Sequence, residues 1–450
     1  MTAAVAAPAA HALLSTRAIR ERAGNIARAV TAGRSPWFRI DRARLPDAAA
    51  RVAAVTRRRY PDLVIPAHSR WRHFEAGGVD RRQELERALV GRTDAERARA
   101  CIDLAVVSVL LDAGAGAAWS FAERETGHSF TRSEGLGVAS FRAFMRGDFS
   151  ATPGDPLRAD AGALAAFDDA KIRAMFAVRD DNPLVGVEGR AALLRRLGAA
   201  LVAERDVFAG RARPGGLFDA RLGPRGLTPA SSGSDPDRSA SAPPRDLTPI
   251  RPGSDPSHPG SDPLIRGADP TITADHLLAA LLTGLASIWP QGNTLDGLAV
   301  GDTWRHPHAG GTGATAGWVP FHKLSQWLAY SLLEPFAWAG VPVAGQDALT
   351  ALPEYRNGGL LLDTGVLVLR DPALARVPHA VGSELVVEWR ALTVALVDEL
   401  APLVRDALHR PDLPLACLLE GGTWAAGREL ARELRGGEPP LAIASDGTVF

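Results

Sequence analysis

An acid, a phenol and a guanidinium stand side by side between two apolar stretches of residues 349–367. Glu354, Tyr355 and Arg356 follow Pro353 and precede two glycines. A carboxylate beside an arginine often forms a structural ion pair, whereas prolines and glycines favour a helix end or a loop, where polar groups face a cleft. Two interpretations are therefore open: a buried ion pair, or a carboxylate positioned for catalysis, with Tyr355 and Arg356 orienting it or a ligand.

A second polar cluster precedes a glycine-rich segment in LDGLAVGDTWRHPHAGGTGATAG. Asp302 is the second candidate catalytic carboxylate, and either His306 or Tyr355 is a candidate proton donor. The indole of Trp304 is suited to stacking on a planar ring. The His-x-His spacing lacks a third spaced ligand, and the glycines lack the Gly-Lys-Ser/Thr ending of a phosphate-binding loop. We therefore expect neither a metal site nor a cofactor.

The stretch IPAHSRWRHFEAGG concentrates cationic and aromatic side chains in a region expected to be a loop. Guanidinium groups match phosphate geometry, and aromatic rings stack on planar ligands. The same side chains can instead clamp helices through cation–π contacts, so both interpretations stay open. The candidate ligand-binding residues of this stretch are His68, Arg70, Trp71, Arg72 and His73. Glu134, in the sequence SEGLG, is a further candidate for the wall of a ligand site.

Pro320 is expected to open a helix through PFHKLSQWLAYSLLEPFAW. Lys323 and Gln326 lie one turn apart on one face of that helix, separate from an apolar stripe. A lysine and a glutamine on one face can bind a phosphate or a polar ring, or they can be solvated. Both residues are kept as candidate ligand contacts.

Helical periodicity dominates the elements that must position these residues. Ser15 and Thr16 are candidate caps of a helix that ends near Gly33. Strand signals are scarce, and one short strand is expected around Val366 to Leu369. The predicted fold class is mainly α-helical with a minor β element.

The length of 450 residues suggests about two or three domain equivalents. Residues 213–270 are rich in Pro, Ser, Gly and Asp and repeat GSDP three times. Such a segment buries too little apolar surface to offset the entropy of ordering it. We interpret it as a flexible insertion between an N-terminal helical half, residues 1–212, and a C-terminal helical half, residues 271–450, that holds the catalytic candidates.

Composition limits the classes of function. The net charge is zero, which argues against a nucleic-acid or membrane-surface partner. The longest apolar run is shorter than the ~20 residues that span a bilayer, and the N-terminus lacks the basic region of a signal peptide. The two cysteines have no metal or disulfide spacing. These features predict a cytoplasmic protein.

Six separated stretches together resemble the family tied to uracil catabolism in fungi and bacteria, often labelled uracil-catabolism protein four. They occur in order, and the resemblance covers nearly the whole chain apart from the insertion. The stretches are HSRWRHFEAGGVDR, LDAGAGAAWSF, SEGLGVASF, DNPLVGVEGRAALLRRLG, VPFHKLSQWLAYSLLEPF and LPEYRNGGLLLDTGVL.

A more distant likeness joins the chain to the queuosine salvage proteins, which are α-helical N-glycosidases acting on a 5′-phosphorylated nucleoside. Their aromatic residue, lysine and glutamine match Phe321, Lys323 and Gln326. Their segment ending in an acid, Tyr and Arg matches residues 354–356, with Asp in place of Glu. An acidic residue further along the lysine helix falls on Ser331 here, and Glu334 is nearly one turn on.

This resemblance implies a fold related to the helical DNA glycosylases. It also implies cleavage or exchange of a ribosyl C–N bond, which in uracil catabolism releases a base or a urea fragment from a ribose 5-phosphate derivative. The expected partner is this phosphorylated ribosyl substrate, and other uracil-catabolism enzymes are possible partners. Two alternatives stay open: phosphoribosyl transfer to uracil, and a non-catalytic helical scaffold or regulator of the pathway.

Overall fold

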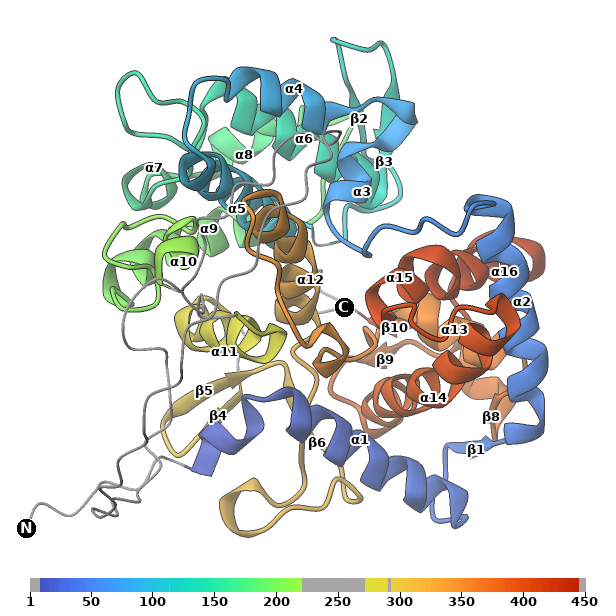
Figure 1. The fold of residues 1–450 in the computed structure, drawn as a ribbon. Helices are drawn as coiled ribbons and strands as arrows, with labels where there is room; N and C mark the ends of the chain where they lie inside the picture. The colour runs from blue at the N-terminus through green and yellow to red at the C-terminus, as the bar shows by residue number, and fades with distance from the viewer. Residues whose placement is uncertain (1–8, 113, 221–271, 290–292, 445–450) are drawn as a thin grey trace, which may run out of the picture.

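The chain folds into a mainly helical molecule with short pairs of strands (Figure 1). The structure, a computed structural model, describes residues 9–112, 114–220, 272–289 and 293–444. Up to residue 220 the elements are α1 (Thr16–Thr31), β1 (Phe38–Ile40), α2 (Leu45–Arg59), α3 (Trp71–Phe74), α4 (Arg81–Ala88), α5 (Asp94–Leu110), β2 (Ser120–Ala122), β3 (Ser129–Thr131), α6 (Arg132–Arg146), α7 (Ala161–Ala165), α8 (Asp169–Met175), α9 (Val187–Ala203) and α10 (Gly216–Ala220). The predicted fold class is confirmed.

The second part of the chain carries most of the predicted catalytic candidates. Its elements are α11 (Ala274–Gly284), β4 (Asn293–Leu295), β5 (Leu298–Gly301), β6 (Thr303–Arg305), β7 (Trp318–Pro320), α12 (Lys323–Trp338), α13 (Tyr355–Asp363), β8 (Leu367–Leu369), β9 (His379–Ala380), α14 (Glu384–Leu408), α15 (Leu415–Leu418), α16 (Trp424–Arg435) and β10 (Ile443–Ala444). A π-helical turn, Leu419–Thr423, joins α15 to α16. The predicted strand near residue 368 is β8, which pairs antiparallel with β1.

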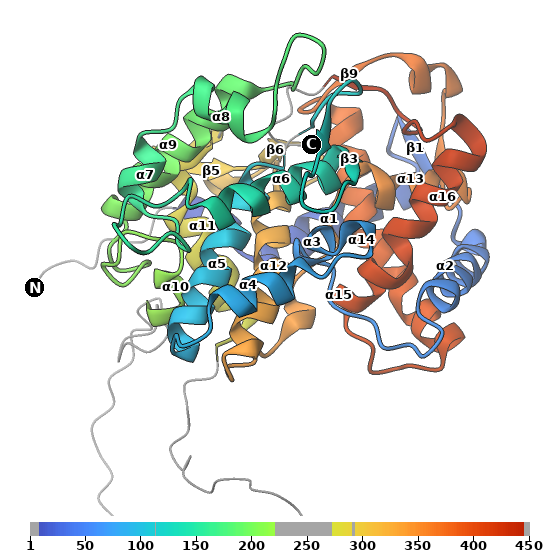
Figure 2. The ribbon, with the colours of Figure 1, turned by 90° about the horizontal axis from the view of Figure 1, so that it is seen from above.

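Helix α12 lies in the middle of the molecule (Figure 1). It packs against α5 and α11, and it separates the elements α3–α10 from the C-terminal helices. Helix α14 is covered by α1 and α2, and α13 packs on both α14 and α16. The view from above shows the same order, with α5 beside α12 and with α2 and α16 at the far edge (Figure 2).

The N-terminal helices complete the core of the C-terminal half, because α1 and α2 pack on α14. Helix α1 begins where its sequence predicts, with the Ser15 hydroxyl accepting the N–H of Ala18 at 3.2 Å. The packed part of the chain extends past the predicted boundary at residue 212, since Arg213 donates to Asp103 at 2.8 Å and α10 packs on α5. The rest of the predicted insertion lies outside the described residues, so its extent stays a prediction.

Strand pairing sets the start of α12. Strand β7 pairs antiparallel with β6, so Pro320 ends a strand instead of opening a helix as predicted. His322 then takes the left-handed conformation, with φ of 47°, and α12 begins at Lys323. The pairing of β6 with β7 brings the two ends of the glycine-rich loop together. The turn at His322 then places Lys323 beside Asp302, the residue immediately before β6.

Of the two predicted settings for Glu354, a helix end or a loop, the structure shows a helix end, and the glycines after Arg356 lie inside helix α13. A Cβ atom at Gly358 would lie 2.8 Å from both the Thr393 hydroxyl and the Trp389 indole of α14. A Cβ atom at Gly427 of α16 would likewise overlap the carbonyl of Arg356. These glycines therefore permit α13 to pack closely between two helices.

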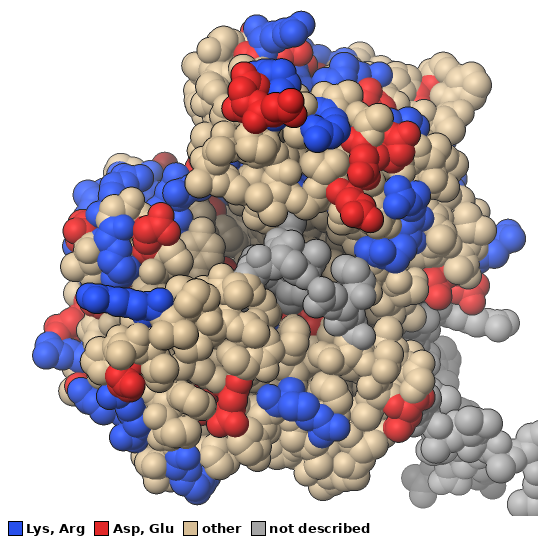
Figure 3. All heavy atoms as spheres, turned by 180° about the vertical axis from the view of Figure 1, so that it is seen from behind, with Lys and Arg blue, Asp and Glu red and all other residues tan. Residues whose placement is uncertain are grey.

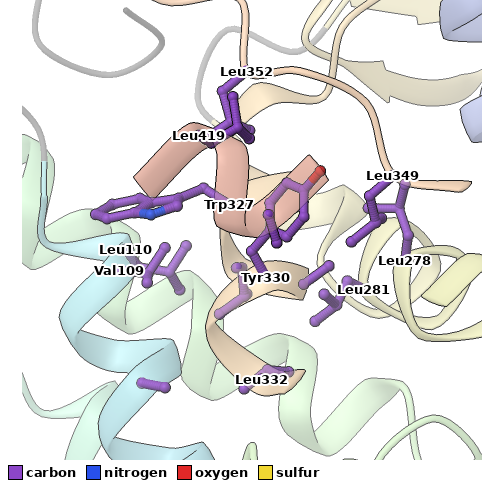
Figure 4. Packing of buried hydrophobic residues seen from close by; sticks show 14 of the residues in the cluster. Val109, Leu110, Leu278, Leu281, Trp327, Tyr330, Leu332, Leu349, Leu352 and Leu419 are labelled. Atoms are coloured by element: carbon purple, nitrogen blue, oxygen red, sulfur yellow. The ribbon is translucent and has the colours of Figure 1, made fainter. Parts of the chain in front are cut away.

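One large apolar core surrounds α12. Figure 4 shows side chains of α12 packed among those of α5, α11 and later segments. Labelled examples are Val109, Leu110, Leu281, Trp327, Tyr330, Leu352 and Leu419. In the described ranges no helix is long and apolar enough to cross a membrane. Figure 3 shows positive and negative side chains interspersed on one face, in keeping with the net charge of zero.

Candidate functional site

Glu354 is the N-cap residue of α13 and lies nine-tenths buried. Its carboxylate accepts the backbone N–H groups of Arg356, at 2.7 Å, and Asn357, at 2.6 Å. Burial raises the pKa of this carboxyl above its ordinary value, against the opposing effects of those two hydrogen bonds and of the Lys323 charge. Glu354 is therefore a fixed, desolvated carboxylate whose oxygens keep lone pairs for a ligand.

Lys323 is the first residue of α12, and its ammonium group lies among charges from several segments. Burial lowers the pKa of Lys323, and the nearby charge of Arg390 does the same. The carboxylates of Glu354, Asp302 and Asp112 act in the opposite direction. The fold therefore brings the predicted lysine and the predicted carboxylates to one place.

Asp302 is held differently from Glu354. It forms a two-pronged ion pair with Arg390 of α14, with both N–O distances 2.7 Å, and it accepts Trp304 Nε1 at 2.7 Å and the Lys323 backbone N–H at 3.1 Å. Although burial acts to raise the pKa of Asp302, the Arg390 guanidinium outweighs this and lowers the pKa to about 2. Because these donors occupy both oxygens, the structure favours an anchoring role for Asp302 over the catalytic role predicted from sequence.

The face of α12 that carries Lys323 continues with Trp327, Ser331 and Glu334 at helical spacing. The predicted cationic and aromatic stretch runs along this face. Its Arg70 donates a backbone N–H to the Ser331 hydroxyl at 2.9 Å. Residues 68–73 therefore line the same side of α12 as Lys323.

Glu334 anchors this stretch to α12. Its carboxylate accepts the Ser69 hydroxyl at 2.6 Å and Arg72 Nη2 at 2.7 Å. Arg72 also pairs with Glu75 at 3.0 Å. The guanidinium of Arg72 is thus held by two carboxylates, and Glu334 fixes the stretch instead of standing free as an acid.

Three buried polar atoms around the Trp327 indole lack a hydrogen-bond partner among the described residues. They are Arg70 Nη2, His73 Nδ1 and Trp327 Nε1. The Arg70 guanidinium lies 5.6 Å, and the His73 ring 5.7 Å, from the Trp327 ring. A buried polar atom without a partner costs about 1–3 kcal/mol, and native proteins normally satisfy such atoms with water or a ligand. We call these three atoms the Trp327 cluster; it marks a place where a polar ligand gains hydrogen bonds.

Helix α16 borders this region from the other side. The ring of partly exposed Trp424 lies 6.2 Å from that of His68, and Arg428, one turn on, stacks on the same indole at 5.3 Å. Arg428 also donates to Glu134 at 3.0 Å. The pKa of His73 lies well below the ordinary value, mainly because the ring is buried, and the charge of Arg428 lowers it further. The predicted wall residue Glu134 therefore lies at the rim of the region that contains His73.

Two predicted ligand contacts lie in the core instead. Trp71 is 1% exposed, donates Nε1 to the Ser331 carbonyl at 2.9 Å and packs edge-on against Trp338. Gln326 has no exposed surface, and its amide bonds the backbone N–H of Thr350 at 2.8 Å and the Thr350 hydroxyl at 2.7 Å. The structure assigns both side chains to packing, because neither has a polar group left to face a ligand.

The predicted proton donor His306 has a buried carboxylate partner of its own. Residues 302 and 306 flank opposite ends of β6, and the His306 ring is enclosed beside Glu388 of α14, with Nε2 3.2 Å from the carboxylate. Trp304 is partly exposed, but its one donor is used by Asp302. His306 therefore forms a structural pair. Within the described ranges, no group of three or more His, Cys, Asp or Glu side chains is arranged to hold a metal ion.

Tyr355 and Arg356 remain beside Glu354 through the chain itself. The Arg356 guanidinium lies 4.5 Å from the Tyr355 ring, and its charge acts to lower the pKa of Glu354. Arg356 is buried and its Nε has no hydrogen-bond partner in the described part of the chain. Arg356 therefore keeps a donor for a ligand, whereas the geometry gives Tyr355 a stacking contact.

A protein-family model matches the chain over residues 12–232 and 255–450, and its description is "Protein of unknown function (DUF1688)". The chain belongs to this family. Over 97% of its length it is 36% identical to "Protein urg3" of Schizosaccharomyces pombe, of which 98% is covered. It is 34% identical to "Uracil catabolism protein 4" of Lachancea kluyveri, over 93% of each chain. The family resemblance stated from the six sequence stretches is confirmed.

The site of this DUF1688 protein includes residues that the sequence pattern alone did not single out: Asp112, Trp327, Arg390, Trp424 and Arg428. One signal was available, because Asp112 ends a long apolar run and Arg390 interrupts another. A charged residue within an apolar helix face requires a partner. The identity of the partner is not local, since Arg390 pairs with a carboxylate 88 positions away.

Proposed function

We propose that this protein acts in uracil catabolism by hydrolysing the C–N bond between ribose 5-phosphate and a nitrogenous group, with ribosylurea 5-phosphate as the representative substrate. The name of the relative "Uracil catabolism protein 4" supports the pathway. The observation that carries the reaction is the buried Glu354 carboxylate beside Lys323, on the α12 face that also carries Trp327 and the unsatisfied polar atoms around it.

Glu354 suits the sugar end of this reaction. Breaking a ribosyl C–N bond builds positive charge on the ring, which a nearby carboxylate stabilises. The two backbone N–H groups hold the carboxylate in place before the substrate binds, so little reorganisation accompanies the reaction. A carboxyl with a raised pKa is also a better base toward water than an ordinary one.

The phosphate end requires positive charge and hydrogen-bond donors. Lys323 supplies the charge, and it lies one helical turn from Trp327 on the same face of α12. Arg70 is fully buried beside this face and has one unsatisfied guanidinium nitrogen. An anionic phosphate satisfies such a donor with a charge-assisted hydrogen bond, which is stronger than a neutral one.

Mass spectrometry of the products tests the proposal. Purified protein is incubated with ribosylurea 5-phosphate and separately with UMP, with heat-denatured protein as the control. We expect release of ribose 5-phosphate without added pyrophosphate. Formation of 5-phosphoribosyl 1-pyrophosphate only when pyrophosphate is added identifies phosphoribosyl transfer instead. No release, together with no thermal shift on adding ribose 5-phosphate, contradicts the proposal and favours a scaffold.

A further inference from the structure

Glu420 occupies a π-helical turn at the edge of the site. The turn, Leu419–Thr423, is fully helical in its backbone but carries one extra residue per turn, a feature found often at functional sites. Its Gly422 lets α2 approach, because a Cβ atom there would lie 2.5 Å from Val52. The turn is thus packed tightly enough to fix the direction of the Glu420 side chain.

Glu420 holds the imidazole of His68. Its Oε2 lies 2.8 Å from His68 Nδ1, and its Oε1 accepts Arg59 Nη2 at 2.8 Å and the Tyr60 hydroxyl at 3.2 Å. Burial acts to raise the pKa of Glu420, but the His68 hydrogen bond and the Arg59 charge bring it below the ordinary value. The ionised carboxylate therefore accepts a hydrogen bond from His68 Nδ1–H and fixes the orientation of the ring.

The other ring nitrogen of His68 is available to a ligand. No described residue is hydrogen-bonded to Nε2, and the side chain keeps 10% of its surface exposed. The ring lies beside partly exposed Trp424, and it is close enough to His73 for a charge on one to affect the pKa of the other. His73 belongs to the Trp327 cluster, so His68 lies at the end of this region that α16 borders.

We propose that His68, oriented by Glu420, donates the proton to the departing nitrogen of the substrate. The inference rests on the proposed hydrolysis. The C1′–N bond breaks with its electron pair on nitrogen, which takes the Nε2 proton of the His68 imidazolium and leaves a neutral ring still bonded through Nδ1–H to Glu420. The oxygen of water forms the new bond to C1′ and gives its proton to Glu354, from which solvent returns one proton to His68. Glu420 is the positioning residue, and Trp424 offers a surface on which a planar leaving group stacks.

The charged and titratable groups that face the pair come from several elements. Glu420 lies on the π-helical turn, Arg59 and Tyr60 lie on or just after α2, and His73 lies on α3. Burial and the Glu420 charge raise the pKa of Tyr60 to about 12, so its hydroxyl stays a donor. The pair is therefore flanked by donors that keep Glu420 an acceptor throughout the neutral range.

The test compares wild type, His68→Gln and His68→Ala on the substrate that the wild type cleaves. We expect kcat to fall about 100-fold in both variants, and added imidazole to restore at least about tenfold in His68→Ala. In Glu420→Gln, kcat should fall about tenfold and the high-pH limb of the rate profile should shift. In His68→Gln, that limb should be missing. His308→Gln, a partly exposed imidazole elsewhere, is the control and should match wild type.

The outcomes separate the two proposals. If the wild type releases ribose 5-phosphate and the His68 variants stay within about threefold, or if a folded His68→Ala variant is slow and imidazole has no effect, the role of His68 is overturned while hydrolysis stands. If the wild type cleaves neither substrate, hydrolysis fails and the role of His68 fails with it. Thermal melting of each variant distinguishes loss of fold from loss of the proton donor.

Discussion

Asp302 and Glu354 are both carboxylates that act on the Lys323 ammonium group, yet the fold gives them opposite properties. Asp302 lies just before β6 and has its pKa lowered to about 2, whereas Glu354 caps α13 and has its pKa raised. Burial acts to raise the pKa in both cases. The difference comes from Arg390, whose guanidinium binds both oxygens of Asp302.

The comparison teaches which buried carboxylate is free to react. Asp302 is neutralised by a dedicated cation, so further chemistry at its oxygens would remove the carboxylate that pairs with the Arg390 charge. Glu354 is fixed by two neutral backbone N–H groups, which orient it without neutralising its charge. The region around α13 therefore offers a reactive carboxylate, and the region around β6 offers an anchored one.

The largest expected effect is on turnover. Glu354→Gln should reduce the rate of ribose 5-phosphate release about a thousandfold, or about 4 kcal/mol, because it removes the charge that stabilises the sugar cation. Its free energy of unfolding should change by about 1 kcal/mol or less, because a glutamine oxygen still accepts an N–H at the cap. Glu433→Gln, a surface carboxylate paired with Arg51, should leave the rate unchanged. Full activity in folded Glu354→Gln removes Glu354 from the reaction.

The next largest effect is on stability. Asp302→Asn should lower the free energy of unfolding by about 3 kcal/mol, because buried Arg390 keeps its charge and loses the carboxylate that pairs with it. Urea denaturation followed by circular dichroism measures this. The double variant Asp302→Asn, Arg390→Met should be less destabilised than the single one. A single variant within about 1 kcal/mol of wild type contradicts the anchoring role.

Lowering the pH should change the contributions of Asp302 and Glu354 to the free energy of unfolding in opposite directions. The folded pKa of Asp302 lies below its ordinary value of 3.8, so its stabilisation is present above about pH 4 and is lost as pH falls toward 2. This loss should amount to about 2 kcal/mol of unfolding free energy and be missing in Asp302→Asn. Glu354, with its raised pKa, should show the reverse, with stability lost as pH rises through the folded value. Stability curves of Asp302→Asn and Glu354→Gln that run parallel to wild type contradict both assignments.

The smallest of these effects concerns binding. Lys323→Met should weaken ribose 5-phosphate binding about tenfold, or about 1.4 kcal/mol, because one cation that faces the phosphate is removed. It should also raise the pKa of Glu354 further, since the Lys323 charge opposes that rise. Calorimetric titration measures the affinity. Lys171→Met, which replaces the other lysine of the chain, is the matched control and should bind as wild type does.

Local signals predicted much of the fold. Ser15 caps α1 as its sequence suggests, and the strand expected near residue 368 is β8. The helix α13 was missed because Gly358–Gly359 are typical of turns. Their actual role, close packing against Trp389, depends on a helix that begins later in the chain. A glycine that allows two helices to cross cannot be distinguished locally from one that allows a turn.

The site, too, was predicted only in part, because several partners of its side chains lie far away in the sequence. Glu354 and Lys323 come together as the family likeness implies, but the His306 pattern equally fits a structural pair, and Glu388 supplies it. Glu420 could not be connected to His68, because 352 positions separate them. Side-chain chemistry was readable from sequence, whereas the partner that neutralises or orients each group was set by packing.

The titration of the Glu354 carboxyl tests most directly whether the two carboxylates differ as described. Protein labelled with ¹³C at glutamate and aspartate carboxyl carbons is titrated by NMR, and the spectra of Glu354→Gln and Asp302→Asn assign the two signals. The structure predicts that Glu354 titrates above the usual glutamate pKa of 4.5 while Asp302 stays ionised over that range. Glu354 titrating together with Asp302, well below pH 4, would contradict it.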